Sequence, residues 1–177
     1  MRLSSWFLLS GSALAAGLIE SSLAGSAPYP LSHVRPLLPG VVLLILLNRP
    51  QAGFVAAGIA GSISDLLKTD SSAFAIARWL MVAFMVDYVS EKVMTNRSLQ
   101  AAWILTVIAR LLDYILLLIS YWISPIILQR TLYIETWKDF IVIAFFDLVI
   151  VTILFIGFTV FTKRFLISVP LTKNRYE

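Results

Sequence analysis

Long apolar runs that contain few charges constrain this chain more than any other feature. Segment 139–162, DFIVIAFFDLVIVTILFIGFTVFT, has only two ionisable residues, Asp139 and Asp147. A helix needs roughly 20 apolar residues to cross a bilayer. Of all 177 residues, 14% are charged, whereas soluble domains contain about 25%. The composition therefore predicts an all-α, polytopic membrane bundle that occupies residues 1–177 as a single transmembrane domain.

Residue types that commonly build catalytic or metal sites are scarce. The chain has no cysteine, which excludes disulfides, thiolate metal sites and a cysteine nucleophile. Its one histidine, His33, lacks the neighbouring nucleophile and oxyanion donors that a Ser-His-Asp hydrolase requires. We therefore predict a protein that is not an enzyme and that uses no metal or cofactor.

Hydropathy and turn residues divide the chain into six candidate spans. Pro36 and Pro39 interrupt the short second span, and Pro50 marks the start of the third. The N-terminal run also has features of a signal peptide, but Glu20 interrupts it, so we predict an uncleaved first span. The predicted spans are about 5–26, 35–48, 50–67, 73–94, 98–123 and 139–162, followed by a basic cytoplasmic tail at 163–177.

Basic residues outside the spans predict the orientation. With six spans, both termini lie on one side of the membrane. Outside the spans, that side has eight Lys and Arg residues, and the other side has four. Cytoplasmic loops carry an excess of such residues, so we predict that both termini are cytoplasmic. The basic residues also contact anionic lipid, and the net charge of +4 does not indicate nucleic-acid binding.

Ionisable residues inside the spans predict ion pairs. Each costs about 2.5–3.5 kcal/mol in a membrane, so such residues usually face protein or water and find partners. Asp65 and Arg78 flank a short loop and are predicted to pair. Arg110 and Asp113 share one helical face, and Asp147 enters the sixth span to a similar depth. We therefore predict that Arg110 bridges Asp113 and Asp147.

A proton or ion relay is the alternative interpretation of these charges. Arginine partners suit a relay poorly, because they hold a carboxylate in its ionised form. A cation-coupled transporter would also need internal repeats or matched broken helices, and the chain shows one broken region, at residues 36–39. Structural ion pairing is therefore the favoured interpretation.

Small residues recur every four positions in the third span. Gly53, Ala57 and Gly61 form one row, and the next step along the row reaches Asp65. Such rows let helices approach closely. Two partners are possible: helices of the same chain, or the helix of another membrane protein. The two alternatives use the same surface chemistry, so the sequence does not separate them.

One region combines these features in a familiar order. Pro39 is followed by GVVLLILL, then Gly53, Phe54, Gly58, Gly61 and Asp65, and then AFAIARWLMVAF at residues 73–84. Over residues 36–95 this order resembles the rod shape-determining protein MreD family. Where that family usually has a glycine shortly after the aspartate, this chain has Ser72 and Ala73.

The resemblance implies a non-catalytic protein of five to six helices in the bacterial cytoplasmic membrane. Such a protein works in the cell-elongation machinery with an MreC-like protein, the actin-like MreB filament and peptidoglycan synthases. Its fold would be similar to that of the substrate-binding subunit of energy-coupling-factor (ECF) transporters. This second family gives an alternative function, the capture of a vitamin or micronutrient. Residues 11–25, GSALAAGLIESSLAG, resemble the small-residue motif with which that subunit contacts its coupling subunit.

Overall fold

Six α-helices account for nearly all of the chain that the structure describes. The computed structural model describes residues 3–26, 28, 35–47, 49–67, 75–93, 98–127 and 137–165, and contains no strand among them. The predicted all-α fold with six helices is confirmed. The helices are α1 (Leu3–Ser26), α2 (Leu37–Leu46), α3 (Pro50–Leu67), α4 (Ala75–Val93), α5 (Leu99–Ile127) and α6 (Trp137–Phe165).

Proline and polar residues determine where several helices begin. Pro50 is the first residue of α3, a position where its missing N–H costs nothing. Ser98 precedes α5, and its Oγ accepts a hydrogen bond from the N–H of Ala101 at 3.2 Å. Between α2 and α3, the N–H of Arg49 donates to the carbonyl of Leu44 at 3.1 Å. This bond closes a tight turn and reverses the chain direction at the break that the sequence predicts.

Helix α2 is shorter than the predicted second span. It has ten residues, which corresponds to about 15 Å, or half of the hydrocarbon core of a bilayer. This agrees with the prediction of a short second span at about 35–48 that Pro36 and Pro39 interrupt, although the helix itself begins at Leu37 and ends at Leu46. Helix α5 is longer than predicted, since it continues to Ile127. Helix α6 reaches Phe165 and so includes the first residues of the predicted tail.

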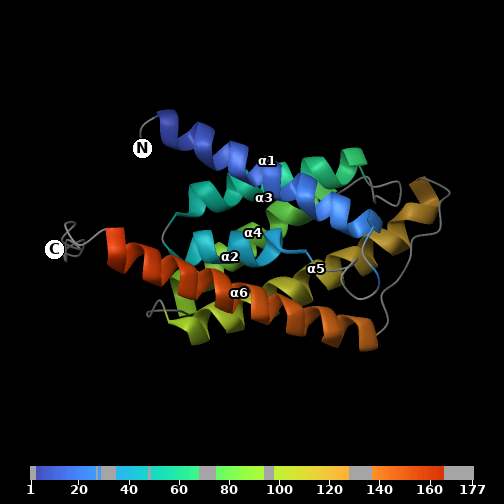
Figure 1. Ribbon diagram of the computed structural model, residues 1–177. Coiled ribbons are helices and arrows are strands. Elements are labelled where there is room, and N and C mark those ends of the chain that lie inside the picture. Colours follow the sequence, from blue (N-terminus) through green and yellow to red (C-terminus); the bar gives the residue numbers. More distant parts are fainter. Residues whose placement is uncertain are drawn as a thin grey trace.

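Helix α2 lies at the centre of the bundle (Figure 1). It contacts all five other helices, and these follow one another around it in the order α1, α3, α4, α5, α6. Successive helices run in opposite directions, so the start of α1 and the end of α6 lie at the same end of the bundle. The ends of α2 and α4 and the starts of α3 and α5 lie at that end as well.

The apolar core forms around α2. Leu38, Val42 and Ile45 of this helix are each at most 2% exposed. Small side chains on the surrounding helices pack against them and let the helices approach the centre closely. These small residues are Ala56, Ala57 and Ala60 of α3, Ala83 of α4, and Ala102 and Ala109 of α5.

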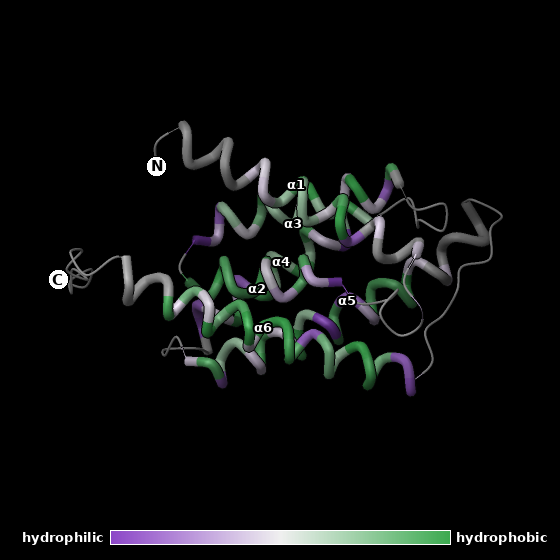
Figure 2. Tube along the Cα trace, viewed as in Figure 1, coloured by the Kyte–Doolittle hydropathy of each residue, from purple (hydrophilic) through white to green (hydrophobic). Residues whose placement is uncertain are grey.

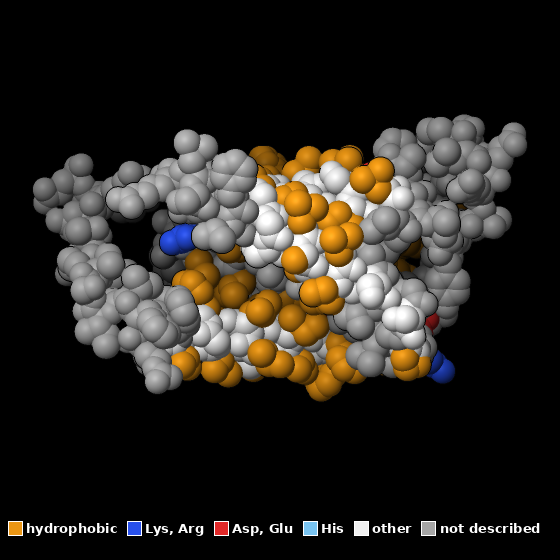
Figure 3. Space-filling model, turned by 45° about the horizontal axis from the view of Figure 1, so that its top comes forward, with side chains coloured by type: hydrophobic (Ala, Val, Ile, Leu, Met, Phe, Trp, Pro, Cys, Tyr) orange, Lys and Arg blue, Asp and Glu red, His pale blue; other side chains and the backbone are white. Residues whose placement is uncertain are grey.

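Apolar side chains also cover much of the outer surface. Hydrophobic residues continue along α5 and α6 (Figure 2), and they spread over the face of the molecule in Figure 3, where the charged side chains in view lie toward the two ends. Phe84 of α4 and Phe145 of α6 are 60% and 63% exposed. Segments Leu99–Ser120 and Trp137–Val160 are the two in the described chain that are long and apolar enough, by length and composition, to cross a membrane.

Candidate functional site

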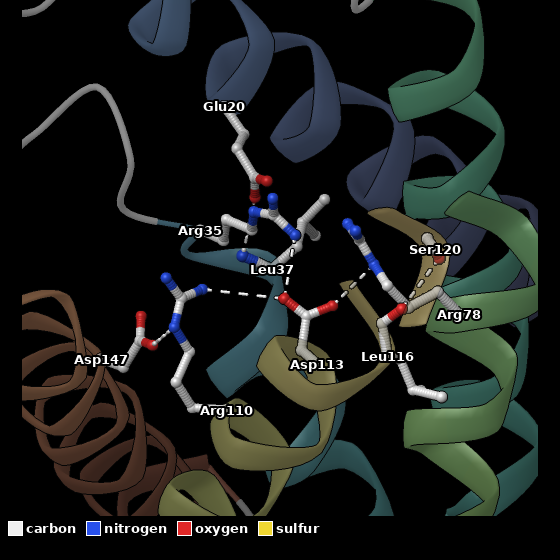
Figure 4. Close-up of polar contacts among 9 residues, drawn as sticks. All are labelled: Glu20, Arg35, Leu37, Arg78, Arg110, Asp113, Leu116, Ser120 and Asp147. Carbon is white, nitrogen blue, oxygen red and sulfur yellow. Dashed lines mark hydrogen bonds and ion pairs between the residues drawn. The ribbon is translucent and has the colours of Figure 1, made fainter. Parts of the chain in front are cut away.

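Asp113 of α5 is the centre of a buried cluster of charged residues (Figure 4). Arg78 of α4 approaches it from one side, with Nε 2.8 Å from Oδ1. Arg35, just before α2, approaches from the other side and donates a hydrogen bond from Nη1 to Oδ2 at 3.0 Å. The side chains of Arg78 and Asp113 are 7% and 5% exposed. Two arginines from different parts of the chain therefore share one carboxylate in the interior, where attraction between charges is stronger than in water.

Arg110 connects this carboxylate to α6. Its Nη1 lies 3.8 Å from Oδ2 of Asp113, and its Nε lies 3.8 Å from Oδ2 of Asp147. Arg110 and Asp147 are 2% and 1% exposed. The structure thus contains the predicted bridge from Arg110 to both aspartates. Its separations are longer than those of direct hydrogen bonds, which join N and O atoms at roughly 2.7–3.2 Å.

Glu20 of α1 extends the cluster to the first turn of α2. Its Oε2 accepts a hydrogen bond from the N–H of Leu37 at 3.1 Å. The first N–H groups of a helix have no partner inside the helix and carry partial positive charge. Pro36, the N-cap residue of α2, provides no capping side chain. Glu20 therefore supplies from another helix the acceptor that α2 needs, and it fixes α1 to the central helix.

The six ionisable side chains of the cluster balance one another in charge. Taking a charged group out of water costs several kcal/mol, which only close partners and further hydrogen bonds offset. Three arginines and three acidic residues meet here, and they come from every part of the bundle except α3. The cluster therefore joins five elements at one place. Its members are Glu20 (α1), Arg35 (before α2), Arg78 (α4), Arg110 and Asp113 (α5), and Asp147 (α6).

Asp65 lies outside this cluster and has a different role from the one predicted. Its Oδ1 accepts a hydrogen bond from the N–H of Ala75 at 3.1 Å, and its Oδ2 accepts one from the N–H of Ile76 at 3.2 Å. The predicted pair between Asp65 and Arg78 is wrong. Arg78 is directed to Asp113, whereas the Asp65 carboxylate satisfies the first N–H groups of α4. Asp65 is therefore an N-terminal cap that reaches across from α3.

The small-residue row of α3 packs inside the chain. Ala57 is 0% exposed. A Cβ atom added to Gly61 would lie 2.5 Å from Cα of Ile76 in α4, and one added to Gly53 would lie 2.5 Å from Cγ1 of Ile45 in α2. The row therefore permits close approach of α3 to both helices. Of the two alternatives that the sequence leaves open, the structure shows packing within the chain.

Arg35 and Glu20 are the members of the cluster whose role hydropathy does not predict. Arg35 resembles an ordinary loop charge, and Glu20 resembles a simple interruption of the first span. One local signal does point to Arg35, because it directly precedes Pro36 and a wholly apolar helix. A residue at that position lies at the start of the most buried helix. No comparable local signal indicates that Glu20 meets the same helix end.

The charged cluster joins helices of the bundle to one another. Asp113 and Asp147 each face arginine, and Glu20 faces a helix terminus, so the three carboxylates are engaged in holding elements together. His33 lies outside the described residues. Comparison with known protein families, with curated proteins and with solved structures found no match. The geometry of the bundle is therefore the basis for a functional proposal.

Proposed function

We propose that this chain is a multi-pass membrane protein whose whole bundle lies in the bilayer. The observation that carries the proposal is the distribution of side chains: charged residues are buried in the bundle, and large apolar residues are exposed on its outside. Arg110 and Asp147 are 2% and 1% exposed, while Phe84, Phe145 and Ile153 are 60%, 63% and 64% exposed. Soluble monomers rarely expose contiguous apolar patches of more than a few hundred Å². Ionisable residues in membrane segments, by contrast, face the interior and pair there.

Helices α1, α3 and α4 belong to the same membrane bundle, although charged residues lower their hydropathy. Glu20, Asp65 and Arg78 make their polar contacts inside the chain. These three charges are therefore kept from lipid, whereas Asp87 is half-buried and Glu91 and Lys92 are exposed, all near the end of α4. Helix α2 is surrounded by protein, a setting in which a half-length helix is tolerated at membrane depth.

Both termini then lie in the cytoplasm. The start of α1 and the end of α6 lie at one end of the bundle (Figure 1). In the six-span topology, eight Lys and Arg residues of the sequence fall on the side of the termini and four on the other side. The basic residues of the first group are Arg2, Arg49, Lys92, Arg97, Lys163, Arg164, Lys173 and Arg175, and those of the second are Lys68, Arg130, Lys138 and Arg35, of which Arg35 pairs with Asp113 in the interior.

Within the membrane we propose a non-catalytic scaffold of the bacterial cell-elongation machinery. The residues that carry the resemblance to MreD support this, because they have specific structural tasks. Gly61 permits contact between the backbones of α3 and α4, and Asp65 caps α4. Such a rigid bundle would present its apolar outer faces to the helices of an MreC-like protein and of peptidoglycan synthases.

A substrate-binding subunit of an ECF transporter is the second candidate, and one observation favours it. Gly11 and Ala15 lie one helical turn apart on α1 and are exposed. A Cβ atom added to Gly11 would have nothing within 4 Å. This short face is open to a helix of another protein, as the contact with a coupling subunit would require.

Co-purification of the full chain from its native membrane in mild detergent tests the proposal. We expect an MreC-like protein and peptidoglycan synthases to be recovered. Recovery of two ATPases with a coupling subunit, or of a bound vitamin-like molecule, would contradict the scaffold function. The Gly11→Leu variant sharpens the comparison. It places a large side chain in open space, so it should preserve the fold and remove only partners that dock on that face of α1.

A further inference from the structure

Asp147 has an unusual position in the charged cluster. The residue is 1% exposed, and both of its carboxylate oxygens are buried without a hydrogen-bond partner among the described residues. Its closest charged contact is the one to Arg110, where Nε and Oδ2 are 3.8 Å apart. By contrast, Oδ1 of Asp113 lies 2.8 Å from Nε of Arg78. Two ion pairs of the same chemical type thus differ in separation by 1.0 Å, the difference between these two distances.

A buried carboxylate in this state has a high free-energy cost. Nearly all buried polar atoms in proteins have a hydrogen-bond partner, which is either protein or ordered water. A separation of 3.8 Å exceeds the usual N–H···O range of roughly 2.7–3.2 Å, and a polar contact longer than about 3.5 Å is commonly mediated by water. A buried water typically makes about three hydrogen bonds. The oxygens of Asp147 and the guanidinium of Arg110 offer acceptors and donors of the kind it needs.

We propose that a water molecule binds between α5 and α6, where it donates to the carboxylate of Asp147 and accepts from the guanidinium of Arg110. The attachment of α6 to the cluster is then partly hydrated, whereas α4 is attached through the direct contact between Arg78 and Asp113. The side chain of Arg35, 13% exposed, is the most accessible member of the Asp113 ion pairs. The proposal rests on the geometry of the cluster and is independent of the scaffold function.

The test is an experimental structure of the full chain in a lipid nanodisc, at a resolution that shows ordered water. We expect a density peak within hydrogen-bond distance of both Arg110 and Asp147. The contact between Arg78 and Asp113 is an internal control, and no peak should separate these two residues. A direct hydrogen bond between Arg110 and Asp147 without such a peak would overturn the proposal, as would an empty space between them.

Two variants at the same position test whether Asp147 holds the water. Asp147→Asn keeps the shape of the side chain and can still accept and donate hydrogen bonds, so the peak should persist. Asp147→Leu removes both properties, so the peak should disappear. A peak that persists in Asp147→Leu would show that the water does not depend on this residue and would contradict the assignment. If Asp147→Leu does not fold, the wild-type and Asp147→Asn maps still decide the question.

Discussion

Arg78 and Asp113 meet in the interior of the bundle, with Nε of the arginine 2.8 Å from Oδ1 of the aspartate. This contact joins α4 to α5. Oδ2 of the same carboxylate accepts a hydrogen bond from Arg35 at 3.0 Å, and Arg110 lies 3.8 Å from it. One aspartate therefore serves three arginines, and the arrangement of these elements depends on its charge.

Loss of the Asp113 charge should strongly destabilise the bundle. Asp113→Asn leaves Arg35, Arg78 and Arg110 without their shared counter-ion, and removing one partner of a buried pair costs about 3–5 kcal/mol. Lys92→Gln is the control, because it also removes one charge but from an exposed position on α4. It should change the free energy of unfolding by no more than about 0.5 kcal/mol. Denaturant titration in detergent micelles measures both, and equal losses for the two variants would contradict the role of Asp113.

Gly61 and Gly58 provide a matched pair on α3. A methyl group at Gly61 would lie 2.5 Å from Cα of Ile76, whereas one at Gly58 has nothing within 4 Å. Gly61→Ala should force α3 and α4 apart and cost about 1–3 kcal/mol. Gly58→Ala should be neutral or stabilising by up to about 1 kcal/mol, since alanine favours helix. Thermal unfolding in detergent distinguishes them, and similar melting temperatures would show that α3 and α4 are not in close contact at Gly61.

Asp65 should act as a cap that is independent of Arg78. Asp65→Ala removes two acceptors from the first turn of α4 and should cost about 1 kcal/mol. Because Asp65 and Arg78 contact different groups, the double variant Asp65→Ala/Arg78→Gln should lose the sum of the two single effects within about 0.5 kcal/mol. A double-mutant cycle on the free energy of unfolding tests this. A coupling free energy well above that margin would instead support the direct ion pair between Asp65 and Arg78 that the sequence predicts.

The sequence predicts those features that depend on local spacing. Proline and polar residues mark the junction before α3, and Arg110 and Asp113 share a face because they are three residues apart in a helix. The depth of Asp147 in α6 then follows from the rise per residue. Local spacing is therefore sufficient to derive the approximate helix ends and the bridge from Arg110 to both aspartates.

The remaining features depend on how the helices pack, which local spacing does not specify. The face of α4 that bears Arg78 turns toward α5 rather than α3, so its partner is Asp113. Asp65 lies at a chain reversal, where the unsatisfied N–H groups of α4 are the nearest donors. The position of α2 is also a result of packing, since this ten-residue helix contacts all five other helices.

The central claim is that the charged cluster lies inside a bundle whose apolar exterior faces lipid. The chain has no cysteine, so single cysteine substitutions give one thiol each and report exposure directly. Arg49→Cys and Lys92→Cys probe the end of the bundle that holds both termini. Lys138→Cys probes the opposite end, and Ile153→Cys probes the outer face of α6. All four positions are exposed in the isolated chain.

Labelling of these variants in cells with a membrane-impermeant maleimide is the most direct measurement. In cells whose outer barrier admits the reagent, Lys138→Cys should react at once, and Arg49→Cys and Lys92→Cys only after the inner membrane is permeabilised. Ile153→Cys should react only after the membrane is dissolved in SDS, because lipid covers this position. Rapid labelling of Ile153→Cys in intact membranes, or recovery of the protein in the soluble fraction, would contradict the account.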